Sequence, residues 1–589
     1  MTSWPGRSWL VRALLARPRP DYALSSLLAG IVLCSGLSYA QVGSAYRISG
    51  VVLNEHDGAP VAGCHLTALR SGIGGTPRGA AVRGDGRRGD GDDGGPTTDS
   101  DASGHFTLVV PSAAGWQIYA YGPGFRRQAY NNHEGFFSAV VLTPAAPTYD
   151  LIFKVESDSS IAGFVRDEAG EAVRNARVSL SAPQSRSTDP AESGGSIRGA
   201  TTTDDRGHYE FAGLAPGDYN VGVQAEPWYA TSLRGRQPAS VAGAAANPSL
   251  DVIYPEMWFP GAAEQRSAET LSLHHGESRQ ANFDLTPAPS THLRISAPQP
   301  PAQLGLHGPM TPQVERVSPT GSPFLNTSVQ VDAQGQIDVD GLSPGLYRVT
   351  LGGPNGPQAP AFVRVPSGAQ RTVDLSAAIP VAEVTLRFDK DVDSSHIQTV
   401  LTDMETGATF TSFRRGDLQR RRNAVPTTAT EGESKLDLPP GRYRVTLAGD
   451  NELYLSGLAL NNKPVDGRIV TVASGSTTLT LKVAAGRATV RGIASASNKP
   501  LAGAMVMLVP ASFGQPESIT ILRRDQTNTD GSFLIESVIP GDYILVAIDD
   551  GWTVNWRDPS TLERYLVRGV PVTLQANATA KQDLTAQSR

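Results

Sequence analysis

The stretch TTDDRGHYEFAGLAPGDYNVGV, residues 202–223, predicts two short strands on either side of a tight turn. Residues 208–211 alternate between polar and apolar side chains, and residues 219–223 form a second run with strand character. Between them, Pro216 fixes the φ of a turn's first corner, and Gly217 tolerates the positive φ that such a turn needs. The stretch therefore predicts a β-hairpin.

Parts of this stretch recur along the chain. The Pro-Gly-x-Tyr turn begins at Pro216, Pro344, Pro440 and Pro540, so successive copies are about 100 residues apart, the size of one small β-sandwich. Three segments also open alike, with a strand of the I-x-G-x-V type that is followed by a turn and a small-residue corner. They begin at Ile48, Ile161 and Val490, and their corners end at Cys64, Ala176 and Ala504.

The successive patterns I-x-G-x-V, P-L-A-G-A, T-x-x-D-x-x-G-x-F and L-x-P-G-x-Y resemble those of the carboxypeptidase regulatory-like domain. The likeness is good over residues 46–125, 159–225 and 488–550, and partial between them. It implies a transthyretin-like, seven-stranded sandwich, often grouped with carbohydrate-binding-like folds, in an exported bacterial protein. It implies no catalytic residue, because in the namesake enzymes this module only accompanies the peptidase domain.

The composition is typical of many short strands joined by turns. The 589 residues include 61 glycines and 43 prolines. We therefore predict an all-β chain, in which four or five small transthyretin-like or Ig-like β-sandwiches, joined by short linkers, follow a signal segment. The predicted boundaries are 1–40 for the signal peptide and 41–155 for the first sandwich, with a disordered loop at 71–96. They continue with 156–289 for a second sandwich with a closing hairpin tail, 290–377 and 378–485 for two partial matches, and 486–589 for the fifth.

The N-terminal residues have the pattern of a targeting segment. Four arginines between residues 7 and 19 precede an apolar run at 23–37, and Ser38-Tyr39-Ala40 offers a cleavage site before Gln41. An uncleaved anchor is the alternative, since residues 22–40 are nearly long enough to cross a bilayer. Either interpretation predicts export to the periplasm, the outer surface or the medium, with no other transmembrane segment.

Charge and cysteine content narrow the class of protein. Removal of residues 1–40 moves the formal net charge from −6 to −9, which argues against nucleic acid as a partner. Only Cys64 would then remain, so no internal disulfide is expected. Its alignment with Ala176 and Ala504 predicts a buried, inert corner residue.

Motifs that resemble catalytic or metal sites have simpler explanations. Residues 341–345, GLSPG, match the G-x-S-x-G motif, but a strand follows, and the second copy has Ala215 at the serine position, so a turn is expected. Solvated loops or turns are also expected at the RGD triplets 83–85 and 88–90, their neighbouring aspartates, His274-His275 and the arginine cluster at 414–422. No catalytic residue, metal site or cofactor is predicted.

Six aromatic residues form the candidate ligand site. Exposed rings at a sandwich edge stack on the apolar faces of sugars, whereas buried rings fasten a tail to the core, and the sequence allows either role. The candidates are Trp228, Tyr229, Trp258 and Phe259 in the second unit, and Trp552 and Trp556 in the last. We expect a non-catalytic envelope protein that binds carbohydrate or adheres, with polysaccharide or envelope proteins as partners. The alternative is a structural spacer or protein-interaction scaffold, and an enzyme is the least expected class.

Overall fold

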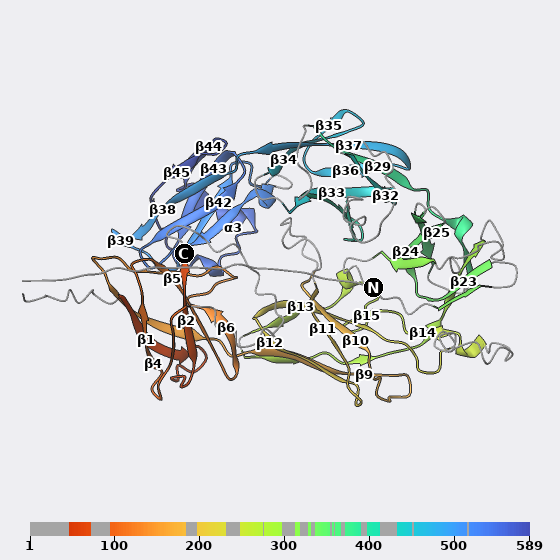
Figure 1. Ribbon diagram of the computed structural model, residues 1–589, viewed down its shortest axis with the longest axis horizontal. Helices are drawn as coiled ribbons and strands as arrows, with labels where there is room; N and C mark the ends of the chain where they lie inside the picture. Colours follow the sequence, from red (N-terminus) through yellow and green to blue (C-terminus); the bar gives the residue numbers. More distant parts are fainter. Residues whose placement is uncertain are drawn as a thin grey trace, which may run out of the picture. The chain divides into compact units, whose positions relative to one another are not determined.

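The computed structural model describes residues 46–71, 95–183, 197–230, 248–274, 276–296, 312–317, 328–331, 336–353, 356–357, 360–366, 372–389, 397–412, 433–449, 453–514 and 518–589. The predicted signal segment lies outside these ranges, as do residues 72–94 of the loop predicted as disordered. Within them, no helix is long and apolar enough to cross a membrane. Strands dominate the described chain, which confirms the predicted all-β array of sandwiches (Figure 1).

The first two sandwiches are each built on two main sheets (Figure 1). In the first, the sheet orders are β4-β1-β8 and β3-β2-β5-β6, with β7 also on β5. The strands are β1 (Tyr46–Asn54), β2 (His65–Ser71), β3 (Thr97–Asp99), β4 (His105–Val110), β5 (Gly115–Gly122), β6 (Phe125–Ala129), β7 (Val140–Val141) and β8 (Thr148–Val155). In the second, the orders are β12-β9-β17, with β18 also on β9, and β11-β10-β13-β15, with β16 also on β13. Its strands are β9 (Ser159–Arg166), β10 (Arg177–Ser181), β11 (Ile197–Thr202), β12 (His208–Leu214), β13 (Gly217–Gln224), β14 (Val252–Ile253), β15 (Met257–Trp258), β16 (Leu271–Leu273), β17 (Ser278–Gln280), β18 (Phe283–Asp284) and β19 (Ala288–Pro289).

The next two sandwiches have the same two-sheet plan. The third contains β22-β23-β20-β28 and β21-β24-β27, and the fourth contains β32-β29-β37-β34-β35 and β31-β30-β33-β36. Their strands are β20 (Thr291–Ser296), β21 (Gln313–Arg316), β22 (Ser328–Val331), β23 (Gln336–Leu342), β24 (Gly345–Thr350), β25 (Gly352–Gly353), β26 (Gly356–Pro357), β27 (Ala361–Val365), β28 (Thr372–Asp374), β29 (Ala382–Phe388), β30 (Gln398–Asp403), β31 (Thr409–Thr411), β32 (Glu433–Leu438), β33 (Gly441–Ala448), β34 (Leu453–Leu460), β35 (Lys463–Val465), β36 (Ile469–Val472) and β37 (Gly475–Ala485).

The last sandwich adds a helix, α3 (Pro559–Leu566), to the plan. Its sheets are β39-β38-β42, with β45 and β46 also on β38, and β41-β40-β43-β44. The strands are β38 (Ala488–Ala496), β39 (Lys499–Pro500), β40 (Met505–Pro510), β41 (Arg523–Gln526), β42 (Ser532–Val538), β43 (Gly541–Ile548), β44 (Val570–Leu574), β45 (Thr579–Lys581) and β46 (Leu584–Thr585). The helix covers the outer face of β40 and β43, where Leu562 and Tyr565 join a second apolar cluster.

All five sandwiches share one pattern of strand pairing. The first strand of each unit pairs antiparallel with the strand that precedes the corner turn, and parallel with the strand or strands that close the unit. The parallel pairs are β1 with β8, β9 with β17 and β18, β20 with β28, β29 with β37, and β38 with β45 and β46. The repeated sequence patterns therefore correspond to a repeated topology.

The prediction of a hairpin at residues 202–223 is wrong. β12 pairs with β9 in one sheet, whereas β13 pairs with β10 in the other, so the turn at Pro216 carries the chain between sheets. The closing hairpin predicted for the second unit is wrong in the same way, because β16 joins β13 while β17 and β18 join β9. A Pro-Gly turn has the same local signature in both settings, so the residues at the turn do not distinguish them.

A tyrosine closes each of these inter-sheet corners. The hydroxyl of Tyr219 donates to the carbonyl of Ala215, four residues earlier, at 2.8 Å. The Tyr347, Tyr443 and Tyr543 hydroxyls make the same bond to Ser343, Pro439 and Ile539, at 2.8, 2.6 and 2.6 Å. In the first unit, the indole N–H of Trp116 donates to the carbonyl of Ser112, 3.2 Å away and again four residues earlier. The tyrosine recurs because its hydroxyl satisfies a carbonyl that the turn leaves unpaired.

The glycine of the I-x-G-x-V pattern is required by close packing of two backbones. A Cβ atom at Gly163 would lie 2.0 Å from the carbonyl oxygen of Ala281, between β17 and β18. At Gly492 the corresponding distance to the Gln582 oxygen is 1.9 Å, and at Gly50 it is 1.9 Å to the Leu151 oxygen. Any side chain at these positions would displace the closing strand of the unit.

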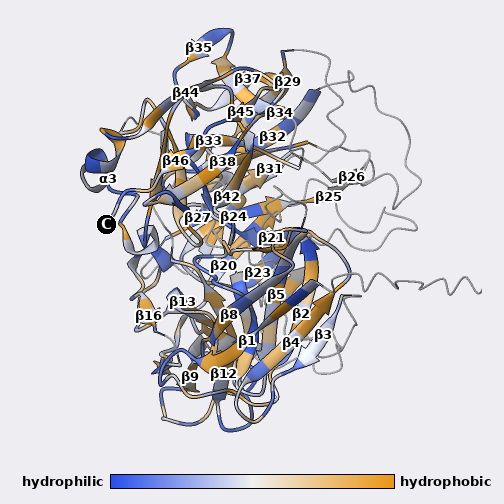
Figure 2. Cartoon of the chain, turned by 90° about the vertical axis from the view of Figure 1, so that its left-hand side faces the viewer, coloured by the Kyte–Doolittle hydropathy of each residue, from blue (hydrophilic) through white to orange (hydrophobic). Residues whose placement is uncertain are grey.

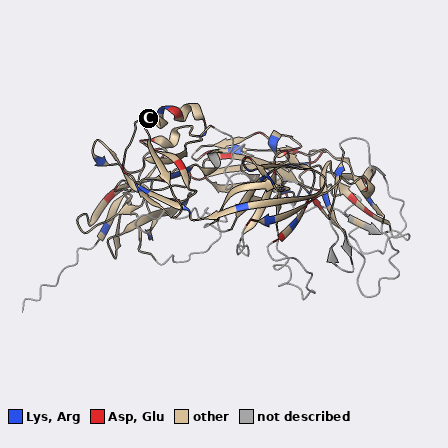
Figure 3. Ribbon diagram, turned by 90° about the horizontal axis from the view of Figure 1, so that it is seen from above, with Lys and Arg blue, Asp and Glu red and all other residues tan. Residues whose placement is uncertain are grey.

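Each sandwich encloses its own apolar core. Along β8 the buried residues Leu151, Phe153 and Val155 alternate with outward-facing ones, the period expected of a strand with one buried face. Figure 2 shows this mixture of hydrophobic and hydrophilic residues along the strands. The cores lie within residues 48–155, 161–285, 293–373, 382–481 and 488–584. Charges of both signs are interspersed along the described chain (Figure 3).

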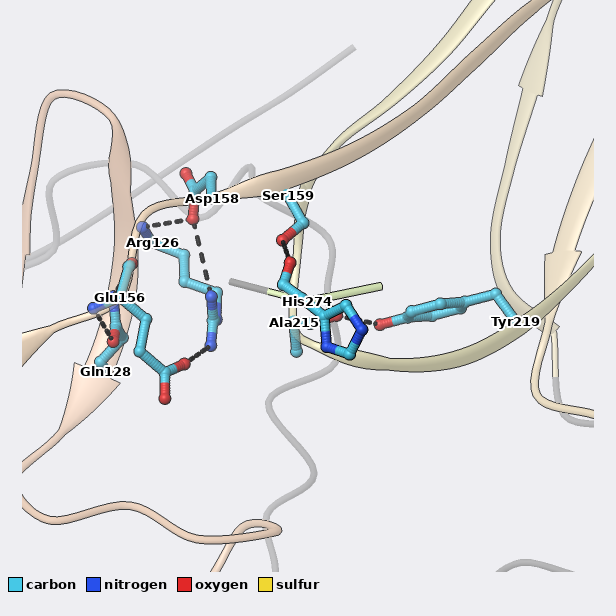
Figure 4. A network of polar contacts seen from close by, with 8 residues as sticks. All are labelled: Arg126, Gln128, Glu156, Asp158, Ser159, Ala215, Tyr219 and His274. Carbon is cyan, nitrogen blue, oxygen red and sulfur yellow. Dashed lines mark hydrogen bonds and ion pairs between the residues drawn. The ribbon is translucent and has the colours of Figure 1, made fainter. Parts of the chain in front are cut away.

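A polar network fixes the connection between the first and second sandwiches (Figure 4). Arg126 on β6 donates its backbone N–H to Asp158 Oδ1 at 2.8 Å, and its Nη2 to Glu156 Oε2 at 2.8 Å. Gln128 forms two further bonds with the backbone of Glu156, at 2.7 and 2.9 Å. On the far side of the connection, the Ser159 hydroxyl donates to the His274 carbonyl at 2.8 Å. The connecting residues are therefore bonded to both sandwiches.

Candidate functional site

The six candidate aromatic residues occupy different environments. Trp228 is 78% exposed, the largest exposure among the aromatic residues of the described chain. Trp258 and Trp556 are buried, and Tyr229, Phe259 and Trp552 are half-buried. Since a ring must present a free face to stack on a ligand, the structure favours Trp228 as the ring that meets solvent and leaves the others with packing contacts.

Trp228 lies beside a carboxylate that holds two tyrosines. Its ring meets the Tyr229 ring edge-on, with the ring centroids 5.6 Å apart. The Tyr229 hydroxyl donates to Glu168 Oε1, and the Tyr254 hydroxyl donates to Glu168 Oε2 at 2.7 Å. These four residues are called the Trp228 patch below. They come from three separate places: the turn after β9, the segment after β13, and the end of β14.

The patch keeps its carboxylate ionised and its phenols protonated. Partial burial opposes the charge on Glu168, but the hydrogen bonds from Tyr229 and Tyr254 outweigh it and hold the pKa of the carboxyl below its ordinary value. Burial and the bond to Glu168 raise the pKa of Tyr229 to about 12. The patch thus offers a flat apolar ring next to an anionic acceptor, whose two oxygens have about four lone-pair sites and use two of them on the phenols.

Trp258 and Phe259 pack inside the second sandwich. Trp258 is 3% exposed, and a Cβ at Gly222 on β13 would come within 3.0 Å of its ring, so this glycine makes room for the indole. Phe259 meets Phe283 edge-on at 6.1 Å. Both rings fasten the tail to the core, which is the alternative that the sequence left open for them.

Trp552 and Trp556 are covered by other side chains. The Trp552 ring stacks on His133 of the first sandwich, with centroids 5.4 Å apart and planes 7° from parallel. Its indole N–H donates to the Gly503 carbonyl at 3.0 Å. Trp556 is 7% exposed, and the guanidinium carbon of Arg524 lies 4.1 Å from its ring centroid. Trp556 is therefore buried, and the stacked His133 ring occupies one face of the half-buried Trp552.

The other motifs have structural explanations where the structure describes them. Ser343 of the G-x-S-x-G match lies in a corner, with its hydroxyl 3.1 Å from the Tyr347 hydroxyl. Cys64 is buried, as predicted for this corner residue, and burial raises the pKa of its thiol to about 11. Its N–H bonds to Ser100 Oγ at 2.9 Å. The equivalent N–H groups of Ala176 and Ala504 bond to Thr203 and Thr527, each at 2.9 Å. No group of three or more metal-ligating residues occurs in the described ranges. The two RGD triplets, His275 and the arginines at 414–422 lie outside those ranges.

Sequence reasoning missed Glu168 and Tyr254. Glu168 stands in a polar turn, Asp167-Glu168-Ala169-Gly170, which carries only a turn signal. Tyr254 lies 86 residues further along, in a tail that contains none of the repeated patterns. No local pattern connects the two, so only the fold brings them to Trp228.

Solved structures with some similarity include a Bacillus protein and two pilins. The Bacillus anthracis TIE protein is 10% identical over 89% of this chain and 68% of its own, with a TM-score of 0.15. GBS52, the minor pilin of Streptococcus agalactiae, is 11% identical over 42% of this chain and 97% of its own, with a TM-score of 0.20. The shaft pilin spaA from Lactobacillus rhamnosus GG is 14% identical over 44% of this chain and 100% of its own, with a TM-score of 0.18. At such TM-scores these likenesses carry no conclusion about function.

Comparison with protein families gives a match within the second unit of the chain. No curated protein matches the chain. The family model of the carboxypeptidase regulatory-like domain matches residues 160–245, which include β9 to β13 and the residues of the repeated corner. The resemblance drawn from the repeated patterns is therefore confirmed for the second sandwich.

Proposed function

We propose that this chain is a non-catalytic, exported protein of the bacterial envelope that binds polysaccharide through the Trp228 patch. The observation that carries the proposal is the 78% exposure of Trp228 beside an ionised, hydrogen-bonded carboxylate. An indole left in water at this exposure gains by covering its face with an apolar surface. Sugar rings present such a surface through their C–H groups and carry hydroxyls around its edge.

The polar half of the patch suits those hydroxyls. Glu168 accepts from two phenols and retains lone pairs that can accept from a sugar O–H. The oxygens of Tyr229 and Tyr254 can each accept one further hydrogen bond. A flat ring flanked by acceptors fits a neutral or hydroxyl-rich sugar better than an acidic one, because the Glu168 charge would repel a second carboxylate.

The test is a glycan array, followed by pulldown on insoluble polysaccharide, with the purified chain. We expect binding to a set of glycans and its loss in Trp228→Ala. Phe164→Ala is the matched control, because Phe164 is another exposed ring of the same sandwich, 37% exposed on β9. Binding to no glycan would overturn the proposal, and so would unchanged binding by Trp228→Ala.

A structural scaffold is the second candidate function. The observation that favours it is the bonded connection between the first two sandwiches, since a spacer gains from connections that do not flex (Figure 4). If the chain is a scaffold, it binds no glycan on the array, and Trp228→Ala changes neither its binding to partners nor its localisation. The same set of variants therefore distinguishes the two functions.

A further inference from the structure

The first and last sandwiches contact each other, although nearly 400 residues of sequence separate their contacting segments. Residues 131–141 of the first sandwich lie against residues 524–529 and Trp552 of the last. We call this the 1–5 contact. It was not expected from the sequence, which predicts sandwiches joined only in series.

Part of the 1–5 contact resembles the pairing of two strands. Thr529 donates its N–H to the Ala139 carbonyl at 3.1 Å. Its hydroxyl accepts from the N–H of Val141 at 2.9 Å, and Asn528 Oδ1 accepts from the N–H of Ala139 at 2.9 Å. The Ser138 hydroxyl donates to the Thr527 carbonyl at 2.7 Å. Each of these bonds satisfies a backbone group of one sandwich with an atom of the other.

Gln526 is buried by the contact and bonded across it. This side chain of the last sandwich is 2% exposed. Its Nε2 donates to the Asn131 carbonyl at 2.6 Å and to Ser138 Oγ at 2.9 Å, and its Oε1 lies 3.0 Å from His133 Nδ1. A buried amide must have its donors and its acceptor paired. All three groups that bond to the Gln526 side chain belong to the first sandwich.

An arginine and a set of rings form the other part of the contact. Arg524 pairs with Glu134 of the first sandwich at 2.9 Å, and its side chain is almost fully buried. Its guanidinium carbon lies 5.2 Å from the Phe136 ring centroid and 5.6 Å from that of Trp552. The rings of His133 and Phe136 both lie against Trp552. A desolvated cation between aromatic faces and a carboxylate is a strong, directional contact.

The last sandwich departs from the other copies at this contact. In the first and second units, the aspartate of the turn uses its Oδ1 on two N–H groups of its own turn, at 2.8 to 2.9 Å, for both Asp101 and Asp204. In the last unit Asn528 stands at this position, and its Oδ1 bonds instead to Ala139 of the first sandwich. Asp530 takes over the bond within the turn, at 3.0 Å to the N–H of Ser532. The turn therefore serves an interaction that its copies do not make.

We propose that the 1–5 contact is a specific protein–protein interface, in which the last sandwich binds residues 131–141 of the same chain and holds the two ends together. The first sandwich is identified as the binding partner by its complementarity to the last. The buried amide of Gln526, the buried cation of Arg524 and the ring of Trp552 each contact a partner on the first sandwich. The interface does not depend on the continuity of the chain between the two sandwiches.

The test is to cut that continuity. A protease site is inserted after Pro380, in the connection between the third and fourth sandwiches, and the cleaved protein is passed over a size-exclusion column. We expect the two pieces to elute together. In the double variant His133→Ala/Phe136→Ala we expect them to separate, with at least a tenfold loss of the co-eluting fraction at low micromolar protein.

Other contacts cross the cut, so the variant is needed beside the cleavage. Phe362 meets Phe410 at 6.1 Å, and Arg266 Nη1 lies 3.5 Å from the Glu405 carbonyl. The matched control is Phe164→Ala, which truncates a ring that lies near a histidine and an arginine within one sandwich. Unchanged far-ultraviolet circular dichroism shows that the double variant is folded. Separation of the unmutated pieces would overturn the proposal, and so would co-elution of the folded double variant.

Discussion

The second and last sandwiches both carry aromatic tails, and the two tails leave their tryptophans in opposite environments. Around residues 226–289, the tail buries Trp258 in its own sandwich and leaves Trp228 open to solvent. In residues 551–569, Trp556 lies under Arg524, and Trp552 lies under His133 of the first sandwich. The tryptophans of the two tails therefore fall into two sets. Trp228 forms the solvent-facing set, and Trp258, Trp552 and Trp556 form the contact set.

The attachments of the two tails also differ in their physical basis. The tail of the second sandwich is attached to the third by charges: Glu256 pairs with Arg316, and His292 Nε2 lies 3.0 Å from Asp251 Oδ2. The tail of the last sandwich contacts the first through rings, because Trp552 lies against His133 and Phe136, next to the ion pair between Arg524 and Glu134. Salt should therefore act more strongly on the first attachment, since ion pairs are screened by salt whereas stacked rings are not. The sequence of a tail alone therefore does not show which of its rings is exposed to solvent.

The largest expected effect is the loss of a buried tryptophan in either tail. Trp258→Ala and Trp556→Ala should each lower the free energy of unfolding of their sandwich by about 3–5 kcal/mol, because each removes a ring from a packed core. Chemical denaturation followed by circular dichroism measures the change. A loss of less than about 1 kcal/mol at either position would contradict the assignment of that ring to the core.

The second effect distinguishes the charged attachment from the stacked one. Hydrogen bonds to the carboxylates of Asp251 and Asp338 raise the pKa of His292 from 6.5 to about 10. Because the folded pKa is the higher one, protonated His292 stabilises the fold, fully below pH 6.5 and progressively less as the pH rises through 10. We expect a loss of about 1–3 kcal/mol across this window.

The measurement is the melting temperature between pH 6 and pH 10, with and without His292→Gln. The variant should flatten the pH dependence of the transition that includes the second and third sandwiches. An equally steep dependence in His292→Gln would show that other groups cause it.

A smaller effect is expected at the tyrosine corners, which occur in the second to fifth sandwiches. Tyr443→Phe removes the buried bond to the Pro439 carbonyl and should cost about 1 kcal/mol of stability. Tyr219→Phe removes the same bond at the more exposed Ala215 carbonyl and should cost less. Urea titration of both variants tests the order. A larger cost at Tyr219 would contradict the view that burial sets the strength of the corner bond.

The repeated residues allowed the fold to be predicted, but not its connections. Gly163 recurs because two backbones pack closely there, and Tyr219 recurs because its hydroxyl closes the corner between sheets. The copies of both residues therefore mark where each sandwich lies along the chain. The turn at Pro216 was assigned to a hairpin because its residues specify a bend, whereas the sheet that the next strand joins depends on distant partners. Helix α3 is not predicted from the sequence, because a helix of eight residues is too short for its apolar period to stand out.

The candidate site could be predicted only in part. Trp228 and Trp552 have similar local sequence character, and their exposure is set by what packs on them from other parts of the chain. Glu168 was invisible because a single carboxylate in a turn is ordinary, and its partner tyrosine lies in a segment without copies. Contacts between residues that are distant in the sequence have no local or periodic pattern, so the sequence alone does not predict them.

The smallest expected effect on stability is at Trp228. Its ring is solvent-facing, so Trp228→Ala should change the free energy of unfolding by less than about 0.5 kcal/mol. Thermal denaturation beside Trp258→Ala makes the comparison within one sandwich. A loss close to that of Trp258→Ala would mean that Trp228 packs rather than faces solvent.

Binding of the unmutated chain, Trp228→Ala and Trp552→Ala to one glycan array tests the central claim most directly. Trp228 belongs to the solvent-facing set, and Trp552 to the contact set. We predict that Trp228→Ala loses the bound glycans while Trp552→Ala keeps them. Binding that survives in Trp228→Ala, or that is lost only in Trp552→Ala, would contradict the assignment of the ligand site to the second sandwich.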